Sequence, residues 1–355
     1  YTLTKRRVEN AALKGGTTDK YGFNHGDKVT YEVVVTNTGN IPIVTYVEDQ
    51  FEDDVKKYFN ELQIESITFK TTADDTTGTG DIITENGCGI GFTKAYIRVP
   101  VGQKAVLLYS AVVADNAPEN LSFSAQDDGN GYRNIAKTTN PHGETPPTTP
   151  DQPGPDVPLP PKEDDGHTPV KVPVPSYEMT KVRVTDATMK SGTTEYGFFR
   201  GDTVTYKVTV KNTGDMDLKM LVDDAFTEHP EYFTAPVIGS VKFMNAENTE
   251  SSASGQLIER EGTGVGTDKA YISLKIGGTA ELYFTSTVTK DAIEYLAPTA
   301  ADDKSTADDG YTNKATVKEV TGTYTDGDGE HTVDKNTEYP VDPKNPDGEK
   351  YKPLV

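Results

Sequence analysis

The sequence contains a single cysteine, no tryptophan and no long apolar run. Because Cys88 stands alone, an intrachain disulfide is excluded, and a covalent cross-link within the chain would need another chemistry. No apolar segment approaches the roughly 18 residues that a membrane-spanning helix requires, and no signal peptide is recognisable. We therefore expect no membrane insertion. Tyr1 already lies in a strand-like run, so we interpret the chain as a fragment of a longer protein.

Positive charge is scarce as well. The chain has 35 Lys and Arg against 56 Asp and Glu, which gives a formal net charge of −21. Proteins that bind nucleic acids gain most of their affinity by neutralising phosphates with Lys and Arg. The charge balance therefore excludes a nucleic-acid partner, and it also excludes binding to an anionic membrane surface.

Residues typical of strands and turns are plentiful. The 355 residues include 32 glycines, 22 prolines and 19 tyrosines, and Val and Thr gather in short runs. This usage favours an all-β protein. The length suits two domains plus connecting segments.

One long segment occurs twice. The first copy begins at Gly16 and reads GTTDKYGFNHGDKVTYEVVVTNTGN. A similar segment begins at Gly192 and reads GTTEYGFFRGDTVTYKVTVKNTGD. Further matches at a similar offset pair VEDQF from Val47 with VDDAF from Val222, and GYRNIAK from Gly131 with GYTNKAT from Gly310. A repeat of about 175 residues is a whole domain rather than a solenoid unit.

The repeat and the proline content divide the chain into four parts. Residues 141–176 hold 12 of the 22 prolines, a composition that favours an extended spacer. We predict a first β-sandwich repeat at 1–140, a proline-rich linker at 141–176, a second β-sandwich repeat at 177–322 and a polar C-terminal tail at 323–355.

Alternation within the repeats predicts two packed sheets. Val29, Tyr31, Val33 and Val35 share one strand face, and a face so apolar needs a second sheet to cover it. Short strands with Gly and Asn turns indicate an immunoglobulin-like sandwich. Only a crossover such as residues 53–62 shows helical spacing.

Polar residues recur on these apolar faces. Period-2 alternation places Lys5, Asp49 and Asn134 among apolar side chains of a first, a middle and a last strand. The corresponding residues of the second repeat are Lys181, Asp224 and Asn313. Each is costly to bury alone. Solvated edge lysines, hydrogen-bonded core asparagines and strand-end aspartates are the alternative readings.

Buried together, these groups can react. Desolvation lowers the pKa of a lysine and raises that of an aspartate, by up to about 3 to 5 units when burial is complete. We hypothesise that Lys5 Nζ attacks the amide carbon of Asn134 while protonated Asp49 assists and shuttles protons. The corresponding trio of the second repeat would react alike. Such a self-made isopeptide bond forms once, so the protein is not an enzyme in the usual sense.

At these residues the chain resembles the isopeptide-bonded immunoglobulin-like domains of Gram-positive surface adhesins and pilins. The motifs that carry the resemblance are LTK and MTK, GDxVTYxVxVxNTG, an acidic VxD strand and a final YxNxA, present in both repeats. The resemblance implies lysine as nucleophile, asparagine as acceptor and aspartate as catalytic acid. It also implies a secreted, cell-wall-attached structural protein. No LPxTG-type sorting signal is present, so we expect anchoring to lie outside this fragment.

Other motifs do not indicate a cofactor or a metal. The five histidines are scattered without metal-ligand spacing, and the Gly-rich loop around Cys88 lacks the context of a phosphate cradle. The acidic loops lack a complete calcium-binding pattern and are read as solvated turns. The loop residues in question are Asp127, Asp128, Asn130, Asp308, Asp309, Asp326, Asp328 and Glu330.

The sequence thus favours a structural stalk whose neighbours are further repeats of the same polypeptide. A ligand-binding adhesin for an unidentified host or matrix molecule is the alternative, with the divergent segments 70–92 and 244–266 as its surface. An accessory module of a carbohydrate-active enzyme ranks third, because no Trp is available for a sugar platform. Lys344, in VDPKN, bears only a faint likeness to a pilin polymerisation motif.

Overall fold

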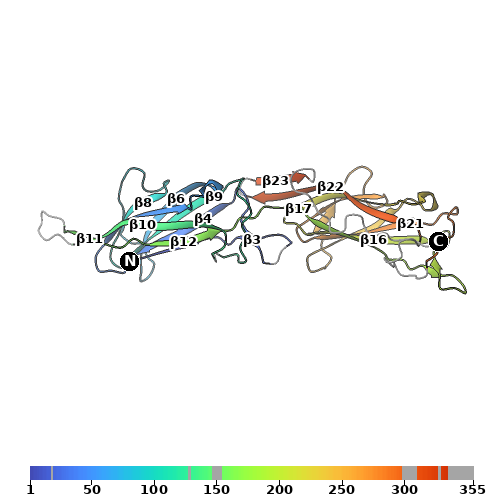
Figure 1. Ribbon diagram of the computed structural model, residues 1–355, viewed down its shortest axis with the longest axis horizontal. Coiled ribbons are helices and arrows are strands. Elements are labelled where there is room, and N and C mark those ends of the chain that lie inside the picture. The colour runs from blue at the N-terminus through green and yellow to red at the C-terminus, as the bar shows by residue number, and fades with distance from the viewer. Residues whose placement is uncertain (17–18, 127–128, 146–153, 298–309, 327–328, 335–355) are drawn as a thin grey trace. The chain divides into compact units, whose positions relative to one another are not determined.

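The computed structural model describes residues 1–16, 19–126, 129–145, 154–297, 310–326 and 329–334. The chain divides into two compact units: Tyr1–Val172 with Thr325–Gly329, and Pro173–Tyr324 with Glu330–Val355. In the described residues the only helices are two single 3₁₀ turns, η1 (Lys56–Tyr58) and η2 (Pro230–Tyr232). The prediction of an all-β fold is confirmed (Figure 1).

The first unit consists of two main sheets and a small β-pair. One sheet has the order β1-β4-β9-β6, and the other has the order β11-β10-β5-β8-β7, with β12 also pairing with β10. The strands of the first sheet are β1 (Thr2–Arg7), β4 (Lys28–Thr36), β9 (Gln103–Val113) and β6 (Phe59–Thr71). Those of the second are β5 (Ile43–Phe51), β7 (Asp81–Ile82), β8 (Lys94–Val99), β10 (Tyr132–Glu144), β11 (Asp156–Pro158) and β12 (Glu163–Thr168). The small pair is β2 (Ala12–Leu13) with β3 (Tyr21–Gly22).

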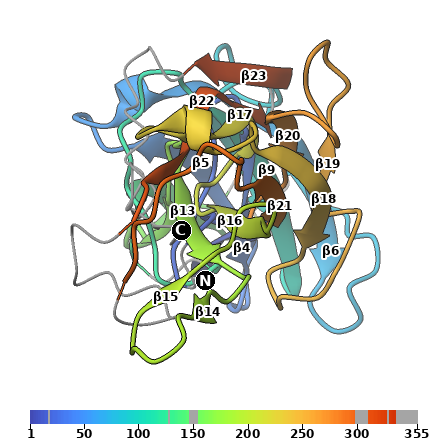
Figure 2. The ribbon, with the colours of Figure 1, turned by 90° about the vertical axis from the view of Figure 1, so that its right-hand side faces the viewer.

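The second unit repeats this plan. One sheet has the order β13-β16-β21-β18 and the other has the order β19-β20-β17-β22-β23. The first contains β13 (Tyr177–Arg183), β16 (Thr203–Asn212), β18 (Val237–Met244) and β21 (Thr279–Thr287). The second contains β17 (Asp217–Phe226), β19 (Gly255–Leu257), β20 (Lys269–Leu274), β22 (Asn313–Asp326) and β23 (Gly329–Asp334), and β14 (Thr188–Met189) pairs with β15 (Tyr196–Gly197). Figure 2 shows β17 and β22 in a layer separate from β13 and β16.

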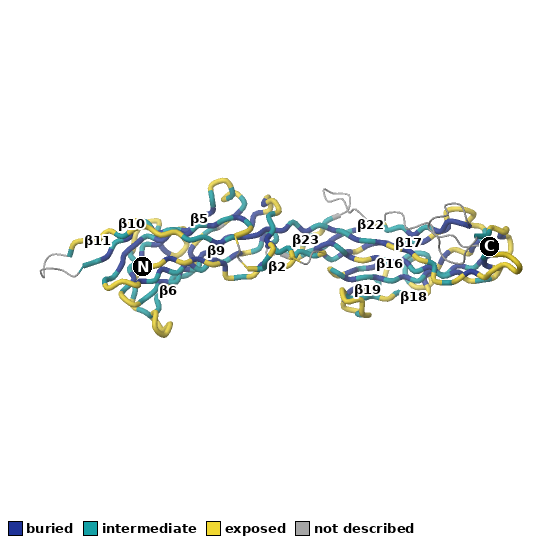
Figure 3. The backbone as a smooth tube through the Cα atoms, turned by 60° about the horizontal axis from the view of Figure 1, so that its bottom comes forward, coloured by how far each residue is buried: buried dark blue, intermediate teal, exposed yellow. Residues whose placement is uncertain are grey.

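The core lies between the two sheets of each unit. Val29, Tyr31, Val33 and Val35 are all fully buried, as their alternation predicted, and Figure 3 shows buried and accessible positions alternating along the strands. The same cluster contains Val47 from the second sheet. Burial of these faces against each other is the main stabilising term of a two-sheet unit.

The prediction of a proline-rich spacer at 141–176 is wrong for the residues that the structure describes. β10 continues through Glu144, β11 and β12 add to its free edge, and Val170 is fully buried and bridges to Phe23 and Asn120. Backbone pairing with an open strand edge outweighs the extended preference of the prolines. Residues 146–153 lie outside the described part.

Two smaller predictions also need correction. The helix expected at 53–62 is reduced to η1, because Phe59 stacks on Phe51 with ring centroids 3.8 Å apart and begins β6. The tail expected from residue 323 begins inside β22, which β23 follows. Residues 335–355, including Lys344, lie outside the described residues.

The structure was also searched for membrane-spanning helices. None of the described residues belongs to a helix that is long and apolar enough to cross a bilayer.

Candidate functional site

The structure brings Lys5 and Asp49 of the first unit together in its core. β1 alternates between outward and inward residues, so Lys5 points inward, and its side chain and that of Asp49 are fully buried. Lys5 Nζ lies 2.7 Å from Asp49 Oδ1 and 2.8 Å from Oδ2. A buried pair of this kind carries a large desolvation cost that its attraction only partly offsets.

Asn134 lies on the strand beside Asp49. In the antiparallel pairing of β10 with β5, Asn134 is opposite Phe51 and Ala136 is opposite Asp49. Asn134 and Asp49 are therefore diagonal neighbours on one inward face, a separation that side chains can bridge. Asn134 is fully buried, so the first-strand lysine, the middle-strand aspartate and the last-strand asparagine all face the same core.

The amide of Asn134 is not held as a structural amide. Within the described part of the chain, neither its Oδ1 nor its Nδ2 has a hydrogen-bond partner. Leaving a buried amide unsatisfied costs about 1–3 kcal/mol, so such groups call for an explanation. The alternative reading of a hydrogen-bonded core asparagine is not what the structure shows here.

The second unit repeats the arrangement. Lys181 Nζ contacts both Asp224 Oδ1 and Asn313 Oδ1. The register is also repeated, with Asn313 opposite Phe226 and Ala315 opposite Asp224. Lys181 and Asn313 are fully buried and Asp224 is 2% exposed. The predicted site residues of both repeats thus occupy matching places in the two units.

Burial raises the pKa of both aspartates. Desolvation is the largest cause for Asp49, and it outweighs the lowering by the charge and hydrogen bonds of Lys5. The pKa of Asp224 is raised by desolvation against the opposing effects of Lys181. Each carboxyl group therefore keeps a proton more readily than in water. A carboxyl that can hold a proton beside an amine and an amide can carry protons between them.

A tyrosine completes each site. The ring centroid of Tyr31 lies 4.0 Å from Lys5 Nζ, and that of Tyr206 lies 4.5 Å from Lys181 Nζ. The rings give the lysine head a flat apolar wall and some cation–π attraction. We did not predict these residues as part of the site, although the repeated VTY motif was a signal for them.

The NTG motif forms a structural turn rather than part of the reactive group. Asn37 donates from Nδ2 to the carbonyls of Ile41 and Val99 at 2.9 and 3.0 Å, and its Oδ1 accepts from Gly39 N–H. Asn212 makes the corresponding bonds in the second unit. This asparagine therefore stabilises the end of the strand that it terminates.

The remaining candidate groups lie apart from these sites. Cys88 is half-buried in a loop with positive-φ glycines. In the residues that the structure describes, no group of three or more His, Cys, Asp or Glu could hold a metal ion. Several acidic-loop residues lie outside the described part, namely Asp127, Asp128, Asp308, Asp309 and Asp328.

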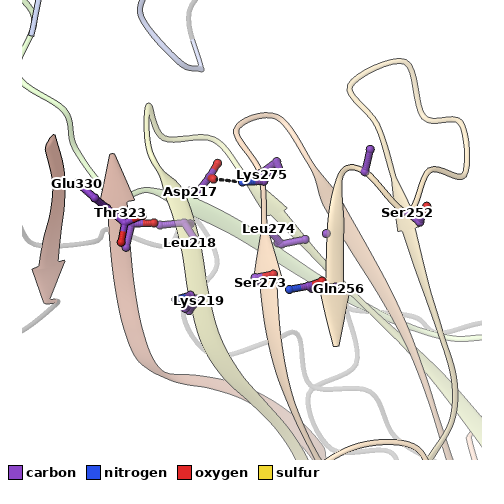
Figure 4. Close-up of a pocket in the computed structure, with 12 residues that line it drawn as sticks. Asp217, Leu218, Lys219, Ser252, Gln256, Ser273, Leu274, Lys275, Thr323 and Glu330 are labelled. Carbon is purple, nitrogen blue, oxygen red and sulfur yellow. Dashed lines mark hydrogen bonds and ion pairs between the residues drawn. The ribbon is translucent and has the colours of Figure 1, made fainter. Parts of the chain in front are cut away.

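A groove lies partly on one of the divergent segments. In the second unit, a space of about 270 Å³ is lined by residues from β17, β19 and β20 together with Ser252 and Glu330 (Figure 4). Two of its lining residues, Lys275 and Asp217, form an ion pair. Gln256 and Ser273 add neutral polar groups.

No protein-family profile and no curated protein matches the chain. Among solved structures, the collagen adhesin of S. aureus matches at 9% identity with a TM-score of 0.20, over 94% of this chain and 92% of that one. A protein of a family of unknown function from Parabacteroides merdae matches at 8% identity with a TM-score of 0.20, over 81% of this chain and 99% of that one. Scores this low bear on neither the fold nor the function.

Proposed function

We propose that this chain is a structural stalk of a bacterial cell-surface protein, in which each unit is locked by an internal Lys–Asn isopeptide bond. The observation that carries the proposal is the buried trio on the first, middle and last strands of each unit. The motif resemblance adds an extracellular, cell-wall-attached location in a Gram-positive bacterium.

The chemistry follows from the contacts of the first unit. With its proton passed to Asp49, Lys5 Nζ is an uncharged amine and attacks Cγ of Asn134. The protonated carboxyl of Asp49 donates a hydrogen bond to the amide oxygen, which stabilises the charge that develops there. The new Cγ–Nζ bond forms, the Cγ–Nδ2 bond breaks, and Asp49 transfers a lysine proton to the leaving nitrogen, which departs as ammonia.

The reaction consumes its own side chains. Lys5 and Asn134 become one amide, so the unit reacts once and no substrate from outside is turned over. We therefore propose a self-cross-linking structural protein rather than an enzyme. Lys181, Asp224 and Asn313 perform the same reaction in the second unit.

Intact mass under denaturing conditions tests the proposal. The wild-type chain should be lighter than its sequence mass by two ammonias. Lys5→Ala and Lys181→Ala should each restore one of them, because each removes one nucleophile. A wild-type mass equal to the sequence mass would refute the cross-links.

The groove of the second unit favours ligand binding as a second candidate function. Its lining combines charged and neutral polar side chains with the apolar Leu218 and Leu274, and it lies partly on the segment in which the two repeats diverge. Purified matrix proteins can be passed over the immobilised chain and over Ser273→Trp, a variant that fills the groove. Binding that is lost in Ser273→Trp supports an adhesin, and binding that is equal in both chains contradicts this site.

A further inference from the structure

Strand β12 comes from the segment that the sequence assigned to a spacer, and it borders the first reactive site. It pairs with the half of β10 that carries Asn134, and Gly166 lies directly opposite that asparagine. β12 also lies beside β1, the edge strand that carries Lys5. The strand therefore borders both the nucleophile's strand and the acceptor's strand.

One contact fixes the backbone of the nucleophile itself. Lys5 is paired with Val33 in the register of β1 with β4, and its backbone N–H donates to Asp164 Oδ2 at 2.6 Å. A hydrogen bond to a carboxylate is stronger than one between neutral groups. Asp164 thus ties the backbone of Lys5 to the strand that flanks Asn134.

A second contact is made with Tyr31, the tyrosine whose ring lies beside Lys5 Nζ. The hydroxyl of Tyr31 is hydrogen-bonded to Oγ1 of Thr168, and both residues are fully buried. Thr168 shares a strand face with Asp164 and Gly166. Side chains on one face of β12 therefore contact the Lys5 backbone and the Tyr31 hydroxyl, and the backbone of β12 pairs with the strand that carries Asn134.

We propose that Asp164 is a positioning residue for the first cross-link, and that this bond forms only after the chain through β12 has been made and folded. The inference rests on the proposed isopeptide reaction. Asp164 does not touch the reacting atoms. It holds the Lys5 backbone at the place from which Nζ reaches the amide carbon of Asn134, and small displacements of reacting groups slow such reactions strongly.

The test uses the full chain, synthesised in vitro and denatured at intervals so that its mass reports each ammonia lost. Asp164→Ala should slow the first-unit bond by about tenfold or more. Asp164→Asn should restore the rate, because an amide oxygen also accepts the Lys5 N–H. Asp165→Ala is the matched control, since Asp165 lies on the opposite face and accepts from Arg133 Nε. The second-unit bond should form at its usual rate in every variant.

A measurement that does not depend on the bond distinguishes a loss of positioning from a misfolded variant. In the Asn134→Ala background, Asp164→Ala should speed hydrogen exchange of the Lys5 N–H, measured by NMR, and Asp164→Asn should leave it slow. First-unit bond formation at the wild-type rate in Asp164→Ala would overturn the positioning role. If Asp164→Asn slowed bond formation as much as Asp164→Ala, the positioning role would also be overturned, because the effect would then depend on the negative charge of Asp164. A wild-type chain that loses no ammonia would refute the proposed function itself.

Discussion

The substitution Asn134→Ala would isolate the contribution of the proposed cross-link in the first unit. Compared with the unlinked chain, it leaves the buried pair of Lys5 and Asp49 in place, and it removes an amide that has no hydrogen-bond partner among the described residues. The small cavity it creates costs about 1 kcal/mol, which is offset by the loss of an unsatisfied polar group. The change in stability should therefore report the covalent bond.

The magnitude follows from the size of the loop that the bond closes. In the second unit, 132 positions separate Lys181 from Asn313, and the proposed bond of the first unit would close a loop of similar length. By the loop-entropy relation, closing roughly 130 residues stabilises the folded state by about 5 kcal/mol. For a unit of this size, that corresponds to a melting temperature lower by roughly 10–20 °C in Asn134→Ala.

Differential scanning calorimetry of the full chain, with intact mass on the same samples, measures this effect. Asn60→Ala, which changes an exposed asparagine of the same unit, is the control and should leave the first unit's transition in place. Suppose the mass shows that Asn134→Ala has lost the first bond, yet the transition moves by less than about 3 °C. The loop-entropy reasoning would then be wrong.

Three further outcomes are expected. Under single-molecule force, Asn313→Ala should add an extension of up to about 450 Å that the wild-type chain lacks, because roughly 130 residues become free to unravel; equal extensions would contradict the bond. In urea unfolding, raising the pH from about 4 to 7 should destabilise the first unit of Asn134→Ala more than that of the double variant Asn134→Ala/Asp49→Asn. The reason is that the pKa of Asp49 in the folded state is raised above its usual 3.8, so the folded state loses its preferential protonation across that range. A gain in stability relative to the double variant would contradict this sign. Asn37→Ala should cost about 2–4 kcal/mol in the same assay because three hydrogen bonds of a buried side chain are lost, whereas Asn60→Ala should cost almost nothing.

Much of the first site could be predicted because strands have a period of two. The inward faces of Val29 and Tyr31 and the inward positions of Lys5 and Asn134 follow from counting alternate residues, and the structure places them so. Repetition added information, since a polar residue that recurs on an apolar face in two copies is seldom accidental. The face of each residue was therefore predictable, although its partners were not.

β12 was missed because its composition conceals its pairing. The segment around it is rich in proline, and Asp164 and Asp165 look like solvent-exposed residues. The strand forms because β10 has a free edge, which is a property of the folded sheet and not of the local sequence. The role of Tyr31 was missed for a related reason, since an inward tyrosine looks like ordinary core.

The position of Asn134 on β10 also decides how the first unit would respond to load. Asn134 lies near the start of that strand, so most of β10 and all of β11 and β12 follow it in the chain. If Lys5 is joined to Asn134, tension bypasses the chain between these two residues and acts only on the strands that follow Asn134. These strands would detach first and pair again when the tension is released. The unit would therefore extend by a short, reversible step, and the cross-link would prevent further unfolding. A stalk built in this way would damp a sudden pull without losing its fold.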